Sequence, residues 1–252
     1  MITRQQLVAF IDEKLGSARI KDYCPNGLQV EGRDTIRTVV TGVTASQALL
    51  EQAVALNADA VLVHHGYFWK NEAMQVVGMK KQRLATLLKH DINLLAYHLP
   101  LDVHPQLGNN AQLGKILGIT APQPVLTAEP AGVLQLGQLP APASLQQLAA
   151  TLSQQLEREV LLEDAGIGEI RTVAWCTGGG QGYIEQAAAA GAQLFVTGEV
   201  SEQTIHVARE LGIHFIAAGH HATERYGIKA LGEYLAAELG LSVLFIDIPN
   251  PA

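Results

Sequence analysis

The chain has 252 residues, enough for one large domain or two small ones with a buried core. It is 48% hydrophobic and 16% charged, which excludes an intrinsically disordered chain, and its net charge of -7 argues against binding of duplex nucleic acid through a basic face. No apolar run approaches the roughly 20 residues that cross a bilayer, and the two cysteines form no CxxC motif. We therefore expect a cytoplasmic protein without disulfides that binds neither membranes nor nucleic acid.

The N-terminal segment predicts a helix followed by a turn-rich stretch. Thr3–Gln6 has the pattern of a capping box, and apolar residues follow it at helical spacing as far as Gly16. Asp22–Gly32 is polar and has Pro25-Asn26-Gly27 at its centre, which is typical of turns.

Three apolar runs further along the chain predict buried strands, and each is followed directly by residue types that bind transition metals. Ligands collect at the carboxyl ends of the strands in parallel α/β sheets, so we expect the three clusters to converge. The runs are Ala58–Val63, Asn93–Tyr97 and Phe215–Ala218, and the clusters are His64-His65, His98 with Asp102, and His220-His221 with Glu224.

An internal repeat relates the two halves of the chain. Arg37–Gly66 aligns without gaps onto Arg171–Val200, and the later pairs His98/His220 and Asp102/Glu224 match at a second offset. Each half reads as β-α-β followed by α-β-α, so the predicted fold class is α/β with largely parallel sheets. Two similar units that converged under common packing rules are the alternative explanation.

Prolines mark the connection between the halves. Thr120–Ser144 holds half of the prolines, and a short strand is expected within it at 133–139. Ser144–Gln147 then caps a helix that runs towards Glu159. We place the boundary near residue 125, which gives an N-terminal domain, 1–124, with His64, His65 and Asp102, and a C-terminal domain, 125–252, with His220 and Glu224.

The spacing within the clusters is compatible with a shared centre for two ions. Gly66 can release the backbone from strand geometry, so that each of the adjacent imidazoles of His64 and His65 reaches one ion. Asp102 can ligate beside them, and His220 and Glu224 share a face if their segment is helical. Each pattern alone is typical of structural histidines, and it is their combination that favours a metal site. Nitrogen and oxygen donors without thiolate favour Zn, Mn, Fe, Ni or Co over Ca and Mg.

Two further residues are candidates for a role beside such ions. Two ions about 3.5–4 Å apart commonly serve hydrolysis. His98 and Glu199 are our candidates for proton transfer, or for orienting a ligand through a hydrogen bond, and the repeat aligns Glu199 with His65. The glycines of Thr177–Gln181 fit a tight strand-to-helix turn, with contact to a phosphate as the alternative.

Together these motifs resemble the Nif-three-like family of dinuclear metal-binding proteins, whose members are often called GTP cyclohydrolase type-two homologues. The resemblance runs from end to end of the chain. It is carried by Tyr23–Val30, Gly42–Ser46, His64–Gly66, Thr197–Gln203 and Gly219–Glu224, and is greatest to the short bacterial members. It implies that His64, His65, Asp102, His220 and Glu224 are the metal ligands. It also implies two interlinked α/β domains with the metal site between them, and a ring-shaped homohexamer, a toroid whose sites face an internal cavity.

The function that we expect is a dinuclear metal-dependent hydrolase. Its substrate would be a nucleotide or a related small phosphorylated or heterocyclic compound, and the resemblance supplies GTP cyclohydrolysis as the named possibility. The alternatives are a non-enzymatic metal-binding assembly or interaction protein, and an adaptor whose histidines bind no metal.

Overall fold

A computed structural model describes all residues from 1 to 252, and the chain divides into two compact units. Unit 1 comprises Met1–Leu101 and Gly227–Pro249, and unit 2 comprises Asp102–Tyr226 and Asn250–Ala252. These bounds differ from the sequence halves 1–124 and 125–252, and the division of the chain by its repeat stays a prediction. No helix combines the length and the apolar character that a membrane crossing requires.

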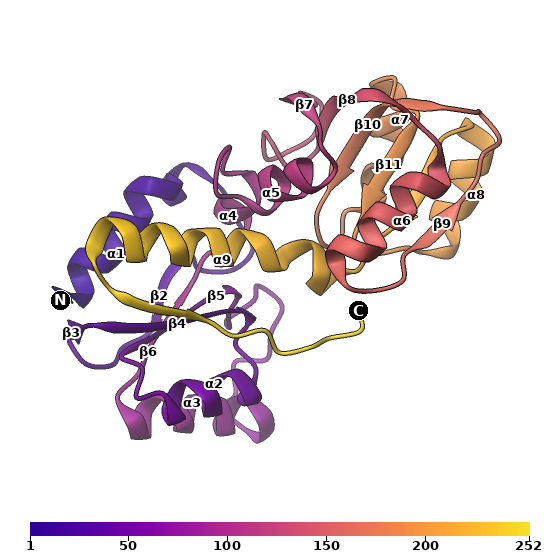
Figure 1. Cartoon of the computed structure of the whole chain (residues 1–252). Helices are drawn as coiled ribbons and strands as arrows, with labels where there is room; N and C mark the ends of the chain where they lie inside the picture. Colours follow the sequence, from indigo (N-terminus) through magenta and orange to yellow (C-terminus); the bar gives the residue numbers. More distant parts are fainter. The chain divides into compact units, whose positions relative to one another are not determined.

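Unit 1 is built on a five-stranded sheet in the order β13-β4-β5-β6-β2. The first four strands run parallel, and β2 is antiparallel to β6. Helices α2 and α3 cover one face of this sheet, and α1 and the Gly227–Leu239 part of α9 cover the other (Figure 1). The elements are β1 (Ile2–Thr3), α1 (Arg4–Leu15), η1 (Ser17–Arg19), β2 (Gly27–Val30), β3 (Thr35–Ile36), β4 (Thr38–Thr44), α2 (Gln47–Ala55), β5 (Ala60–His65), α3 (Gly78–His90), β6 (Asn93–Ala96) and β13 (Ser242–Phe245).

Unit 2 contains a six-stranded sheet in the order β7-β8-β10-β11-β12-β9. The central strands β10, β11 and β12 run parallel, and the outer strands are antiparallel to their neighbours. Its elements are α5 (Asn109–Ile116), β7 (Thr120–Pro124), β8 (Gln135–Ala143), α6 (Leu145–Leu156), β9 (Leu161–Glu163), β10 (Ile170–Cys176), η2 (Gln181–Tyr183), α7 (Ile184–Ala189), β11 (Leu194–Thr197), α8 (Glu202–Leu211) and β12 (His214–Ala217). Two helices, α4 (Leu99–Val103) and α9 (His220–Leu239), each contain a unit boundary.

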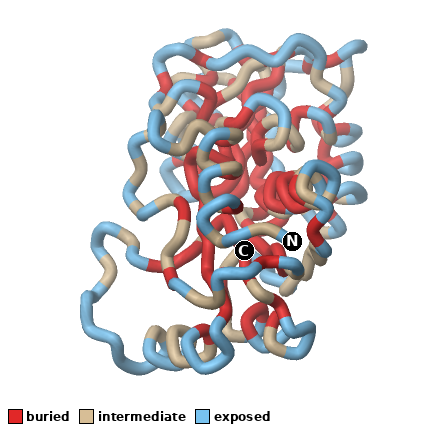
Figure 2. Tube along the Cα trace, turned by 90° about the vertical axis from the view of Figure 1, so that its left-hand side faces the viewer, coloured by how far each residue is buried: buried red, intermediate tan, exposed pale blue.

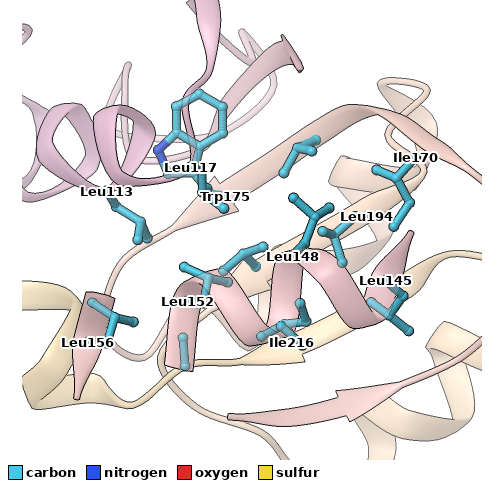
Figure 3. Close-up of a cluster of buried hydrophobic side chains, with 14 of the residues drawn as sticks. Leu113, Leu117, Leu145, Leu148, Leu152, Leu156, Ile170, Trp175, Leu194 and Ile216 are labelled. Carbon is cyan, nitrogen blue, oxygen red and sulfur yellow. The ribbon is translucent and has the colours of Figure 1, made fainter. Parts of the chain in front are cut away.

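The alternation of side chains along the strands of unit 2 gives its sheet two apolar faces. Trp175 and Ile216 pack with α5 and α6 on one face, as Figure 3 shows for the labelled residues. Ala174, Phe195 and Phe215 pack with α7 and α8 on the other face. Unit 1 has its own core, in which residues of β4, β5 and β6 pack against α2 and α3. Burial is accordingly concentrated in the interior strands, which are red in Figure 2.

The structure confirms the α/β class and the helices expected from capping boxes. Thr3 caps α1, which ends at Gly16, and Ser144 caps α6, each with a complete capping box. The repeat also has a structural counterpart within each unit. In unit 1, β4, α2 and β5 are followed by α3 and β6, and in unit 2, β10, α7 and β11 are followed by α8 and β12.

Some elements differ from the expectation. The stretch expected to be turn-rich contains the edge strand β2. Only one edge of β2 is paired, with β6, so the strand tolerates polar residues and lacks the apolar pattern of a buried strand. The strand expected at 133–139 lies at Gln135–Ala143. Sequence periodicity also does not reveal that β13, near the C-terminus, joins the sheet of unit 1 beside β4.

Candidate metal centre

The strand β5 ends in the two adjacent histidines of unit 1. His64 is fully buried, and its Nδ1 lies 3.0 Å from the carbonyl oxygen of Tyr97. A carbonyl oxygen only accepts hydrogen bonds, so Nδ1 carries the proton of the neutral ring. The lone pair of the ring is therefore on Nε2, where a metal ion can bind it.

His65 is half-buried, and its Nδ1 lies 3.3 Å from Oγ1 of Thr44, the residue paired with it on β4. The chain leaves the strand at Gly66, where a Cβ atom would collide with Oε1 of Gln29 and lie 2.6 Å from Cβ of Ala96. Glycine is therefore required for the close approach at this point. The Gln29 side chain holds the following turn, because it accepts from the amide of Tyr67 at 2.7 Å and donates to the Tyr67 carbonyl at 3.1 Å.

His98 is anchored by Asp22, a residue that the sequence analysis did not single out. Oδ1 of Asp22 lies 3.0 Å from Nδ1 of His98, and Oδ2 accepts from the Leu99 amide at 2.9 Å. The side chain of Asn26 donates to the same Oδ2 at 3.0 Å, and its carbonyl oxygen accepts from the His98 amide at 2.8 Å. Burial raises the pKa of Asp22, but its hydrogen bond and its charge interaction with His98, helped by Asn26 and Leu99, outweigh burial and lower the pKa to about 2.

The three imidazoles of unit 1 converge. His64, His65 and His98 each offer a ligand atom, and these atoms all lie within 4.8 Å of one another. The ring centroids are 4.5 Å apart for His64 and His65, and 5.0 Å for His64 and His98. Since each Nδ1 has a hydrogen-bonding partner, we infer that the three Nε2 atoms form the donor group. His98 lies beside His64 and His65, and its expected role, proton transfer or the orientation of a ligand, stays a prediction.

Cys24 also lies near this cluster, within 4.8 Å of ligand atoms of Asp22 and His98. Asp22, however, already accepts four hydrogen bonds, two at each oxygen, because the Tyr23 amide also donates to Oδ1 at 2.7 Å. A carboxylate with about four lone-pair positions has little capacity left for a cation. Asp22 is therefore better suited to orient His98 than to bind a metal.

Unit 2 contributes a second group, at the start of α9. Nε2 of His220 lies 3.2 Å from Oε2 of Glu224, as expected for residues four apart on a helix, and Glu224 is buried. Nδ1 of His220 lies 2.7 Å from Oε1 of Glu199, whose Oε2 accepts from the side chain of Gln181 at 3.1 Å. Burial lowers the pKa of His220, but Glu224 and then Glu199 outweigh it and raise the pKa to about 9.

Asp102 is the other acidic residue of unit 2 expected to bind metal, and it is also buried. Its Oδ1 accepts from the Asn109 side chain at 2.8 Å and from the Thr177 hydroxyl at 3.4 Å. Burial is the first cause that raises the pKa of the neighbouring Cys176 thiol, and the charges of Asp102 and Glu224 raise it further. The thiol of Cys176 is thereby kept protonated, which makes it a poor metal ligand.

The glycine-rich turn after β10 packs against the acidic group. Gly178 has φ +65, and a Cβ atom there would collide with Oε1 of Glu224 and lie 3.0 Å from Nε2 of His220. The Gly178 amide donates to the Thr223 hydroxyl at 3.0 Å, and the Gly180 amide donates to the Thr197 hydroxyl at 3.1 Å. Because these amides are occupied within unit 2, the arrangement favours the tight turn over the phosphate contact.

The donor chemistry fits a transition metal in both units. Unit 1 offers three buried or half-buried imidazoles with their orientation fixed by hydrogen bonds, and unit 2 offers an imidazole with carboxylates. Nitrogen donors combined with carboxylate oxygens suit Zn, Mn, Fe, Co or Ni. The chain therefore contains His, Asp and Glu groups that can bind a metal.

Sequence reasoning missed the residues that orient these donors. Asp22, Thr44, Asn109 and Thr177 are each hydrogen-bonded to one of the expected site residues. The signal for Asp22 was its position directly before the Tyr23–Val30 motif. Thr44 lies within the Gly42–Ser46 motif, but its contact with His65 arises only through the pairing of β4 with β5.

Comparison with known proteins places this site in a family. The family model Duf34/NIF3 (NGG1p interacting factor 3) matches residues 2–251. A Pseudomonas aeruginosa protein named GTP cyclohydrolase 1 type 2 homolog is 59% identical over 251 residues, covering 100% of this chain and 99% of that protein. The structure of a protein called ybgI, of unknown function, is 56% identical with a TM-score of 0.96, and that of a Thermus thermophilus protein, TTHA1606, is 38% identical with a TM-score of 0.90. Both alignments cover 100% of each chain. The chain therefore belongs to the Duf34/NIF3 family.

Proposed function

We propose that this chain is a metal-dependent hydrolase that uses two divalent transition-metal ions. The observation that carries the proposal is the group of three anchored imidazoles in unit 1, together with the carboxylate-flanked imidazole of unit 2. Anchoring of Nδ1 in this way fixes both the tautomer and the ring orientation of a metal-binding histidine. The proposed ligands are His64, His65, Asp102, His220 and Glu224.

Two features support the combination of ligands from both units. Asp102 follows His98 by only four residues, so the covalent chain limits how far this carboxylate can lie from the imidazole cluster. The donors are also complementary in charge. The imidazoles bind as neutral ligands, and the carboxylates of unit 2 supply the negative charge that two divalent cations require.

In the proposed reaction, the residues around the ions hold and move protons. Bound divalent ions lower the pKa of a water molecule towards neutrality and polarise the bond to be hydrolysed. Glu199 hydrogen-bonds Nδ1 of His220, which suits it to orient that ring. His98, whose Nδ1 is held by Asp22, is our candidate to accept or donate a proton.

We propose a nucleotide, or a related small phosphorylated or heterocyclic compound, as the substrate. The Pseudomonas aeruginosa relative is named a GTP cyclohydrolase homologue, and GTP is accordingly the first compound to test. Ring-opening hydrolysis of a purine requires an activated water molecule beside a carbon of the ring. A site with two ions can supply that water.

The test measures metal content and turnover on the same samples. We expect about two ions per chain and hydrolysis of a nucleotide that depends on the added metal, with His65→Ala and Glu224→Gln each abolishing turnover. Glu202→Gln, which changes an exposed carboxylate on α8, is the matched control and should leave both quantities unchanged. Bound metal without turnover on any nucleotide would instead favour a metal-binding assembly. Absence of bound metal would contradict both functions.

We also propose that the chain assembles into a homohexameric ring, as the family resemblance implies. Six copies would have about six times the 27.0 kDa mass of one chain. Light scattering coupled to size-exclusion chromatography measures this mass directly, and the mass of a monomer or dimer would contradict the ring.

A further inference from the structure

Two aromatic side chains stand beside the histidine cluster of unit 1, and the metal chemistry does not account for them. Trp69 follows His65 by four residues and is half-buried, and Tyr23 comes from the turn before β2 and is 53% exposed. Their ring centroids are 6.1 Å apart, with an angle of 35° between the ring planes. Two segments that are distant in the sequence thus bring their rings to one place.

Both rings also lie against the imidazoles, at steep angles to them. The Trp69 centroid lies 5.0 Å from that of His98 at an interplanar angle of 84°, and 6.0 Å from that of His65. The Tyr23 and His98 ring centroids are 5.1 Å apart, with an angle of 67° between the ring planes. Neither ring is in a parallel stack with His98, because both contacts are strongly inclined.

The backbone holds both rings in place before any ligand binds. Phe68 has a positive φ of 65, which is costly for a bulky residue, and Glu72 holds this conformation by accepting from the amides of Phe68 at 2.6 Å and Trp69 at 3.1 Å. The amide of Lys70 donates to the Tyr23 carbonyl at 2.8 Å and ties the two segments together. Strain that is held in this way beside a candidate site is a form of pre-organisation.

Asp22 links this arrangement to the metal donors. The same oxygen that accepts from Nδ1 of His98 also accepts from the amide of Tyr23 at 2.7 Å. One buried carboxylate therefore sets the position of a donor imidazole and of the adjacent phenol ring. A ligand that lies on the aromatic rings is thereby positioned relative to the histidines.

We propose that Tyr23 and Trp69 form a stacking platform for a planar heteroaromatic ring, next to the imidazole cluster of unit 1. The inference rests on the proposed function, since it specifies the class of compound that the same site recognises. Aromatic faces bind flat heterocycles with little dependence on their substituents, and each such stack contributes a substantial share of the affinity. The platform would select a nucleoside-like compound over a sugar phosphate without a ring base.

The test measures the binding of guanosine, with ribose 5-phosphate as the matched compound that lacks the base. We expect guanosine to quench the fluorescence of Trp69 with saturation, and ribose 5-phosphate to leave it unchanged. The second tryptophan, Trp175, is fully buried in unit 2 with its indole nitrogen bonded to the Asn110 carbonyl, and it provides a constant background. Equal binding of both compounds would overturn the platform.

Variants separate stacking from simple apolar contact. By calorimetry, Trp69→Leu should weaken guanosine binding about 5- to 150-fold, whereas Trp69→Phe should stay within a few-fold of the unmodified chain because it keeps a ring. Tyr23→Leu tests the second segment and serves if Trp69→Leu does not fold. Tyr234→Leu removes the stack of Tyr234 on Phe10, which have centroids 5.8 Å apart, and should have no effect.

Metal content is measured on every sample, so that the two proposals fail separately. If Trp69→Leu and Tyr23→Leu retain metal and bind guanosine as tightly as the unmodified chain, the platform is wrong and the proposed hydrolase stands. If the chain holds no metal but loses guanosine binding in both variants, the platform stands and the hydrolase is wrong.

Discussion

The repeat aligns His65, the last residue of β5 in unit 1, with Glu199, which lies shortly after β11 in unit 2. The equivalent ends of two α/β sheets thus carry an imidazole in one unit and a carboxylate in the other. In unit 1 the imidazoles hydrogen-bond a carbonyl, a hydroxyl and one buried carboxylate. In unit 2 a single imidazole, that of His220, lies between two carboxylates.

The difference shows that the repeat conserves the place of the donors but not their chemistry. Sheet topology fixes where a side chain can project, because the carboxyl ends of parallel strands meet at one edge. The topology does not determine which residue type, and so which donor atom, occupies each position. The candidate donors of unit 1 are imidazole nitrogens, whereas those of unit 2 are mainly carboxylate oxygens, and transition metals accept both kinds.

The largest effect on folding stability is expected at Gly178, whose repeat counterpart in unit 1 is Thr44. Gly178→Ala adds a Cβ atom in collision with Oε1 of Glu224, at a backbone φ of +65. The strain and the displaced carboxylate should destabilise unit 2 by about 3–4 kcal/mol. Denaturant unfolding measures this loss, and metal titration should show a parallel loss of affinity.

Thr44→Ala is the matched change in unit 1, where it removes only the hydroxyl beside Nδ1 of His65. We expect it to cost about 1 kcal/mol. Equal losses for Gly178→Ala and Thr44→Ala would contradict the view that the two units support their donors differently.

Asp22→Asn should have the next largest effect. All four hydrogen bonds of Asp22 come from N–H donors, so in either orientation an amide group would present its NH2 to two of them. Unsatisfied buried donors of this kind cost about 2–3 kcal/mol. We expect a lower unfolding free energy in denaturant titrations and reduced turnover, because His98 loses the carboxylate that orients it.

Asp22 also predicts a pH dependence. Its pKa in the folded chain is about 2, against an ordinary value of 3.8, so the stability that its charge contributes is present above pH 4 and is lost as the pH falls towards 2. The contribution is about 2 kcal/mol. Unfolding of the metal-free chain should therefore become easier across this window, and Asp22→Asn should remove that part of the slope.

How far the sequence predicts this site is clear from individual residues. His64, His65, His220 and Glu224 follow apolar runs at strand ends, so local pattern suffices to find them. The hydrogen bond from His98 to Asp22 joins residues 76 apart in the chain, and no periodicity encodes such a pair. The contribution of β13 to the sheet of unit 1 is likewise a long-range pairing.

Gly66 in unit 1 and Val200, which the repeat aligns with it in unit 2, test the comparison of the two units through a smaller change in stability. At Gly66 a Cβ atom would meet Gln29 and Ala96, whereas Val200 is 37% exposed and already carries a branched side chain. Gly66→Ala should cost about 2 kcal/mol, and Val200→Ala less than about 0.5 kcal/mol. Thermal unfolding of the two variants side by side measures the difference. A neutral Gly66→Ala would show that the turn after His65 is not constrained by Gln29.

The last prediction concerns the proton on His220 and tests metal affinity instead of folding stability. Its pKa is raised to about 9, because the pull of Glu224 and Glu199 exceeds the effect of burial, so the ring is protonated at neutral pH in the metal-free chain. A cation must displace this proton, and its affinity should rise about tenfold per pH unit between pH 7 and 9. The charged ring also stabilises the metal-free fold, and this contribution changes with pH in the opposite direction to the metal affinity. It is complete below pH 6.5 and is lost as the pH rises past 9. Calorimetry in buffers of different ionisation enthalpy counts the released protons. Glu199→Gln removes one of the two carboxylates and should reduce the release at pH 8, while an affinity independent of pH in this range would show that His220 is not a ligand.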